Sequence, residues 1–139
     1  MSKTGQCLCG AVRLEARGEP STVHACHCDD CRRFSGSAFI AVNFTEVDLE
    51  GPIRWFASSE WGERGSCEKC GSALFWRLRD EKARESMGTA ITLGAFDDHS
   101  DFGPIHEHYF ADNIPDSYDF TGKGLRLSRE ETMAKFAGA

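Results

Sequence analysis

The sequence of 139 residues contains no long hydrophobic run and no stretch of basic residues with interleaved aromatics. Its first residues, Met1 to Gly5, lack the apolar core of a signal peptide, and no later segment is apolar enough to span a membrane. Sixteen lysines and arginines stand against twenty-two aspartates and glutamates, and the resulting net charge of −6 repels nucleic-acid phosphates. We therefore expect a cytoplasmic protein that binds neither membranes nor nucleic acids.

The chain also has no internal repeat, no low-complexity tract and no linker that would divide it into two domains. Its length is that of one ordinary domain. We expect a single domain over residues 1–139, with its core at about residues 5–120. Only four prolines accompany fourteen glycines, which favours short strands joined by tight turns. Nothing in the sequence indicates an oligomeric state.

Hydrophobic patterning predicts a mostly β structure. Val12 and Leu14 alternate with polar neighbours, as in a strand with one wet face, whereas Phe39–Phe44 is apolar except for Asn43 and indicates a more buried strand. Further strands are predicted at Ile53–Ala57, Ala73–Leu78, Ala90–Leu93 and Ile105–Phe110.

Two segments are predicted to be helical. Asp29–Phe34 would form one or two turns. Near the C-terminus, Ser128 and Glu131 match a capping box that would begin a short helix at about residues 128–137. Met133 and Phe136 follow at helical spacing, so we expect this helix to pack one apolar stripe at the surface.

The sequence is rich in cysteine. The seven cysteines form three groups along the chain: Cys7 and Cys9; Cys26, Cys28 and Cys31; Cys67 and Cys70. An odd number leaves one thiol unpaired in any set of intramolecular disulfides, and the cytosol keeps thiols reduced. Cysteines separated by a tight turn can direct two sulfurs to one Zn²⁺ ion. We therefore interpret all seven as zinc ligands.

Counting divides these ligands between two sites. The three cysteines of the central group supply one incomplete site, here called the three-cysteine cluster, and the other four supply a complete four-cysteine cluster. A zinc ion held by four thiolates has no open position and is structural, whereas three thiolates leave a position for a substrate thiol. His24 and His27 are alternative fourth ligands that would make the second site structural as well.

The cysteine spacing and its neighbours resemble those of one known family. The motifs are Cys7-x-Cys9-Gly10, Cys26-His27-Cys28-x-x-Cys31-Arg32, Gly36-Ser37 and Cys67-x-x-Cys70-Gly71-Ser72. Together they resemble the glutathione-dependent formaldehyde-activating family, whose zinc domain is also named after centromere protein V. The resemblance covers about residues 5–120. Two departures are Ser66, where the family often has an aromatic residue, and Ala111–Asp119, which lacks a tryptophan common in the family.

The resemblance implies an Mss4-like fold of several short antiparallel sheets around two zinc sites. It implies the same division of the cysteines, with the three-cysteine cluster catalytic. The family's founding activity joins glutathione and formaldehyde into S-hydroxymethylglutathione, which implies a zinc-dependent carbon–sulfur lyase that acts on glutathione or another small-thiol adduct. The alternatives are a non-catalytic zinc module that binds a small thiol or a protein partner, and a redox or metal-buffering role.

Glutathione carries two carboxylates, for which an acidic chain must supply local positive charge. Arg32 and Arg33 directly follow Cys31, and Arg64 lies shortly before Cys67, so these three arginines are candidate glutathione-binding residues. The alternative is that they are surface charges paired with nearby acidic residues.

Other side chains have open roles. Trp61 and Phe34 would line a pocket or simply pack in the core. His106 and His108 alternate on one predicted strand, where they would bind metal, relay protons or lie on a half-exposed face.

Overall fold

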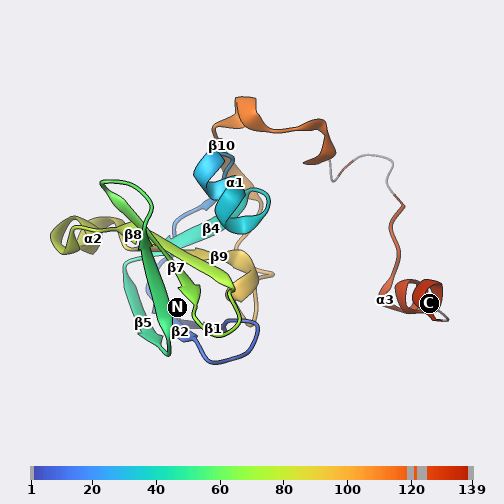
Figure 1. Ribbon diagram of the computed structural model, residues 1–139, viewed down its shortest axis with the longest axis horizontal. Coiled ribbons are helices and arrows are strands. Elements are labelled where there is room, and N and C mark those ends of the chain that lie inside the picture. Colours follow the sequence, from blue (N-terminus) through green and yellow to red (C-terminus); the bar gives the residue numbers. More distant parts are fainter. Residues whose placement is uncertain (1, 119–120, 122–124, 138–139) are drawn as a thin grey trace.

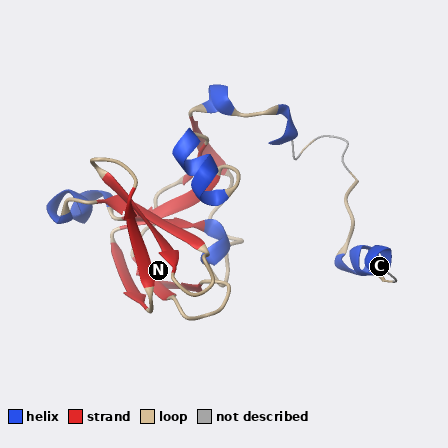
Figure 2. Cartoon of the chain, viewed as in Figure 1, coloured by secondary structure: helices blue, strands red, loops and turns tan. Residues whose placement is uncertain are grey.

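The structure is a computed structural model that describes residues 2–118, 121 and 125–137. These residues form ten strands with short helical segments, and β structure predominates (Figures 1 and 2). The strands are β1 (Ser2–Gln6), β2 (Arg13–Arg17), β3 (Val23–Cys26), β4 (Phe39–Phe44), β5 (Glu46–Glu50), β6 (Ile53–Ala57), β7 (Gly62–Cys67), β8 (Ala73–Leu78), β9 (Thr89–Thr92) and β10 (Ile105–Tyr109). The helices are α1 (Asp29–Ser35), α2 (Glu81–Met87) and α3 (Arg129–Phe136), with 3-10 turns η1 (Leu93–Ala95), η2 (Ala111–Asn113) and η3 (Asp116–Tyr118). In the described part of the chain, none of the helices has the length and apolar character needed to cross a membrane.

The strands form two sheets. The smaller has the order β1-β2-β5, and the larger has the order β10-β3-β4-β9-β8-β7-β6. Neighbouring strands are antiparallel, as predicted, except for β10, which pairs parallel to β3. Because β3 and β10 are far apart in sequence, the intervening chain is long enough for the crossover that a parallel pair requires.

The strands predicted from hydrophobic patterning are confirmed. β4, β6 and β8 have the predicted bounds, β9 is shifted by one residue toward the N-terminus, and β10 ends one residue earlier than predicted. β2 contains Leu14 but begins one residue after Val12, and α1 forms over the predicted helical segment. β7 was not predicted, because its sequence Gly-Glu-Arg-Gly-Ser-Cys has neither alternation nor an apolar run. It becomes a central strand because β6 and β8 pair with it on both sides.

The larger sheet buries side chains on both faces, and β4 shows how. Val42 and Phe44 belong to the main core, together with residues of the smaller sheet such as Leu14. Phe39 and Ala41, which alternate with them, belong to a second, smaller core with Cys31. Since successive side chains of a strand point to opposite faces, the two cores lie on opposite sides of the larger sheet.

Helix α3 confirms one prediction and corrects another. The capping box forms: the Ser128 hydroxyl accepts from the Glu131 amide at 3.0 Å, and the Glu131 carboxylate accepts from the Ser128 amide at 3.4 Å. The predicted packing was wrong, because Met133 and Phe136 are 60% and 62% exposed, and α3 lies apart from the β sheets (Figure 1). A capping box satisfies the helix terminus locally and needs no tertiary partner, and two apolar side chains make too narrow a stripe to require one.

Candidate metal centres and active-site cavity

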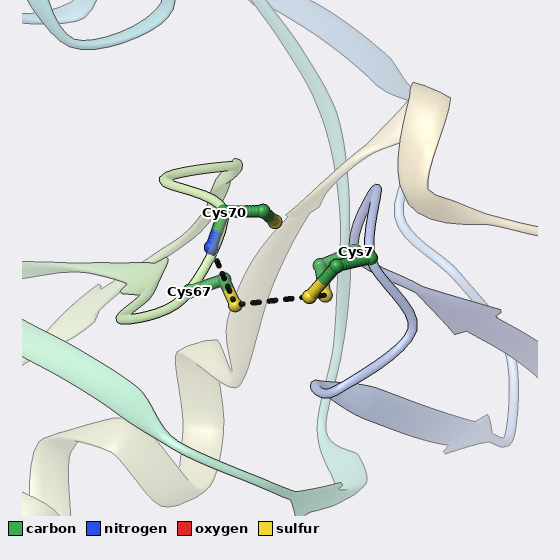
Figure 3. Close-up of side chains that lie close together, drawn as sticks. Cys7, Cys67 and Cys70 are labelled. Atoms are coloured by element: carbon green, nitrogen blue, oxygen red, sulfur yellow. Dashed lines mark hydrogen bonds between the residues drawn. The ribbon is translucent and has the colours of Figure 1, made fainter.

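The four-cysteine cluster brings together two loops that are far apart in sequence. Cys7 and Cys9 lie between β1 and β2, whereas Cys67 ends β7 and Cys70 lies in the turn before β8. The four sulfurs lie within 4.8 Å of one another, with 3.6 Å between Cys7 and Cys9 and 3.8 Å between Cys9 and Cys67. Figure 3 shows Cys67 and Cys70 facing Cys7 from the opposite loop. Tetrahedral zinc with bonds of about 2.3 Å places sulfurs about 3.8 Å apart, so these thiols fit the ion.

Both loops turn under the sulfurs in the same way. Gly10 and Gly71 have φ angles of +81° and +78°, a left-handed conformation that glycine adopts without strain, and their amides donate to the carbonyls of Cys7 and Cys67. Further amides point at sulfur: that of Val12 donates to Cys7 at 3.2 Å and that of Cys70 to Cys67 at 3.4 Å. Amide donors favour the thiolate form that zinc binds.

Ser72 links the two loops. Its hydroxyl accepts from the Leu8 amide at 3.0 Å and lies 3.1 Å from the Cys70 sulfur, within hydrogen-bonding distance. This hydroxyl is the main reason that the pKa of Cys70 falls to about 5. Cys7 and Cys67 are each only 2% exposed and form part of the main core, so this cluster is continuous with the packing that holds the sheets together.

The three-cysteine cluster is local in sequence. Cys26 ends β3, Cys28 caps α1, and Cys31 lies in the first turn of that helix, donating its amide to the Cys28 sulfur at 3.3 Å. The three sulfurs lie within 4.8 Å of one another, and no fourth Cys, His, Asp or Glu ligand atom of the described residues joins them. Hydrogen bonding from the Cys31 thiol lowers the pKa of Cys26 to about 5, and the same bond raises the pKa of Cys31. Three thiols within reach of one ion fit a zinc centre with one position open.

The nearby histidines are engaged elsewhere. The ring of His24 lies 2.9 Å from the Asn43 side-chain oxygen, and the buried ring of His27 lies 3.0 Å from His108 and stacks on it. Neither completes the three-cysteine cluster. The strand that carries His108 has a bulge between Ile105 and Glu107, which breaks the simple alternation expected for His106 and His108.

The predicted arginines separate into two kinds. Arg64 is only 7% exposed; its guanidinium donates to the Cys31 sulfur at 3.5 Å and to the Ser58 hydroxyl at 3.2 Å, and it lies over the Phe34 ring. Arg32 pairs with Asp29 at 3.5 Å, and both Arg32 and Arg33 are exposed on α1. The structure therefore brings Arg64, and not Arg32 or Arg33, to the three-cysteine cluster.

A cavity of about 760 Å³ opens beside the three-cysteine cluster. All three cysteines and Arg64 line it. Much of the remaining wall is aromatic, from Phe39, Trp61, Trp76, Tyr109 and Phe110. A larger hollow of about 950 Å³ lies beside Cys7, but the four-cysteine cluster has no open ligand position to offer it.

Asn43 is a cavity residue whose role was not predicted. It accepts at its side-chain oxygen from His24 and donates its amide hydrogen to the Met87 carbonyl at 3.1 Å, and both Asn43 and His24 line the cavity. The sequence did contain an indication of this role. Asn43 is the one polar residue in an otherwise apolar strand, and it shares the strand face of Phe39 and Ala41 because successive side chains alternate between faces.

Comparison with known proteins agrees with this geometry. Residues 2–112 match the model of the family described as glutathione-dependent formaldehyde-activating enzyme. A protein of Schizosaccharomyces pombe named an uncharacterized lyase is 30% identical over 132 residues, which cover 93% of each chain. The crystal structure of a Rhodobacter sphaeroides protein has the same fold, with a TM-score of 0.55 and 18% identity over 76% of this chain and 98% of that one. The chain therefore belongs to the glutathione-dependent formaldehyde-activating enzyme family.

Proposed function

We propose that the protein is a zinc-dependent carbon–sulfur lyase-type enzyme that forms or cleaves the adduct of a small thiol, such as glutathione, with an aldehyde such as formaldehyde. Family membership and the lyase-named relative support a glutathione-related, lyase-like function. The observation that carries the proposal is the cavity, because the three sulfurs of an incomplete ligand set line a space of about 760 Å³ in which a substrate would fit.

The cysteines and Arg64 have separate roles in this proposal. Cys26, Cys28 and Cys31 hold zinc, which when bound would accept a thiol as its fourth ligand and keep it as a nucleophilic thiolate. Arg64, whose guanidinium lies 3.5 Å from the Cys31 sulfur, offsets part of the negative charge that three thiolates bring together. Its contacts with Ser58 and Phe34 fix this orientation.

The proposed reaction needs only a few contributions from the protein. In adduct formation, the thiolate sulfur bonds to the carbonyl carbon, the π electron pair moves to oxygen, and that oxygen takes up a proton; cleavage reverses each change. The main contributions are therefore a deprotonated thiol and its placement beside the aldehyde. Arg32 and Arg33, exposed on α1, are proposed to receive the carboxylates of glutathione outside the cavity.

Zinc content and adduct kinetics test the proposal together. Zinc per chain is measured for the wild type and for Cys28→Ser, with and without glutathione, and the rate of S-hydroxymethylglutathione formation is compared with the uncatalysed rate. We expect two zinc ions in the wild type, one in Cys28→Ser, slower zinc loss with glutathione, and a catalysed rate that disappears in Cys28→Ser.

The alternative function gives a different pattern. A non-catalytic thiol-binding module would show two zinc ions and protection by glutathione, but no rate above background. A wild type that holds one zinc ion and is unchanged by Cys28→Ser would refute a substrate site at the three-cysteine cluster.

A further inference from the structure

The cavity beside the three-cysteine cluster has an aromatic wall built from distant parts of the chain. Phe39 belongs to the small core and Trp76 packs against it, so these two rings form the inner part of the wall. Trp61, Tyr109 and Phe110 are exposed and form its outer part. Five rings around one space provide a large apolar surface that a ligand can cover.

Phe110 joins this wall at a conformational cost. Its φ angle of 56° is the one positive value among non-glycine residues of the described chain. A left-handed backbone is unfavourable for a bulky residue and persists where the surroundings impose it, often at ligand sites. The strained position therefore coincides with the outer part of the aromatic wall.

The charges in the cavity leave no cation for a ligand carboxylate. Among the described residues that line it, Arg64 is the single lysine or arginine, and its guanidinium already contacts Cys31 and Ser58. Asp30 and Glu107 also line the cavity. Even with Zn²⁺ bound, its two positive charges are exceeded by the three thiolates, so a carboxylate inside would lie beside two others without a free counter-charge. An uncharged ring would lose only its contact with water.

We propose that the cavity selects thiol adducts whose carbon side carries an aromatic or other large uncharged apolar group, in preference to adducts of formaldehyde. The proposal rests on the function proposed above and names its substrate class. In the cleavage direction the adduct loses its C–S bond, the bonding pair stays on sulfur, the hydroxyl proton leaves, and an aromatic aldehyde is released. No oxidant, reductant or further reactant is needed.

Unreactive thioether analogues test this selectivity without turnover. The zinc-loaded full chain is titrated calorimetrically with S-benzylglutathione and with S-methylglutathione, which share the peptide and differ in the group next to sulfur. We expect the benzyl compound to bind at least about tenfold more tightly, since small differences in apolar contact in a pocket already change discrimination by this amount.

Two matched variants locate the effect. Trp61→Ala removes a cavity ring that is 72% exposed, so the protein should still fold. The ratio of the binding constants of S-benzylglutathione and S-methylglutathione should fall toward one. Phe56→Ala removes a ring that is 59% exposed on β6 and does not line the cavity, so the preference should persist. Thermal unfolding checks that both variants are folded.

The outcomes separate this proposal from the one on which it rests. Equal binding of the two analogues, no binding of either, or a preference unaffected by Trp61→Ala would overturn the inferred substrate class. If the benzyl preference is found but adduct formation never exceeds the uncatalysed rate with formaldehyde or benzaldehyde, the proposed enzymatic function fails while the selectivity of the cavity stands.

Discussion

The four-cysteine and three-cysteine clusters offer zinc the same ligand on opposite sides of one sheet. The four-cysteine cluster joins the β1–β2 loop to the β7–β8 turn, and Cys7 and Cys67 are part of the main core. The second is supplied by one β3–α1 junction and packs with the small core. Closing a long loop restricts the unfolded chain far more than closing a loop of a few residues. From ligand number and sequence separation we therefore expect the four-cysteine cluster to stabilise the fold and the three-cysteine cluster to remain available for a substrate.

The strongest test of this difference compares one cysteine from each cluster. Cys67→Ser is expected to abolish cooperative unfolding, because a structural zinc site contributes roughly 10–16 kcal/mol and the stability of a domain is only about 5–15 kcal/mol. Cys28→Ser is expected to keep a cooperative transition. Thermal unfolding followed by near-UV circular dichroism measures both, and equal melting temperatures would contradict the assigned division of roles.

Metal removal from the wild type is expected to occur in two steps. A chelator added under native conditions should take zinc from the three-cysteine cluster at least about tenfold faster, because the open ligand position there lets the chelator bind the ion directly, whereas at the four-cysteine cluster a thiolate must leave first. The near-UV spectrum should persist through the first step and be lost in the second. In Cys28→Ser the fast step should be absent. If it persists in this variant, the rapidly released zinc belongs to the four-cysteine cluster and the prediction is wrong.

Arg64 provides a test that affects one cluster alone. Arg64→Gln removes the guanidinium beside the Cys31 sulfur, and loss of such a supporting contact should weaken zinc binding at the three-cysteine cluster about 10- to 100-fold. Arg32→Gln is the matched control, since Arg32 is exposed and contacts Asp29. Competition with a zinc indicator measures the affinity. Equal losses in the two variants would mean that Arg64 has no special role.

The serines beside each cluster should show the smallest effects. Ser72→Ala removes the hydroxyl that contacts both Cys70 and the Leu8 amide, and should lower the free energy of unfolding by about 1–2 kcal/mol. Ser58→Ala removes the acceptor for Arg64 and should cost less than about 1 kcal/mol. Urea denaturation of both proteins gives the comparison, and a larger loss for Ser58→Ala would reverse it.

The grouping of the cysteines was predictable because zinc chemistry constrains ligand spacing within a few residues, and strands such as β4 were predictable because burial imposes an apolar run. The cavity was not, because its wall combines side chains from Ser21 to Phe110, which only the strand order brings together. Arg64 illustrates the limit: beside a glycine on a strand without alternation, its sequence position gave no sign that its guanidinium would be buried against Cys31.

The wide separation of the ligands in the four-cysteine cluster also affects the newly made chain. A ribosome that has synthesised Cys7 and Cys9 must still add about sixty residues before Cys70 exists, which takes roughly 3–12 s at typical elongation rates. The three-cysteine cluster becomes complete in sequence within that interval, at Cys31, about forty residues before Cys70 is added. We therefore expect that the first zinc site available in the nascent protein is the one proposed for catalysis. The ion expected to stabilise the fold would find its full ligand set only after Cys70 has been added.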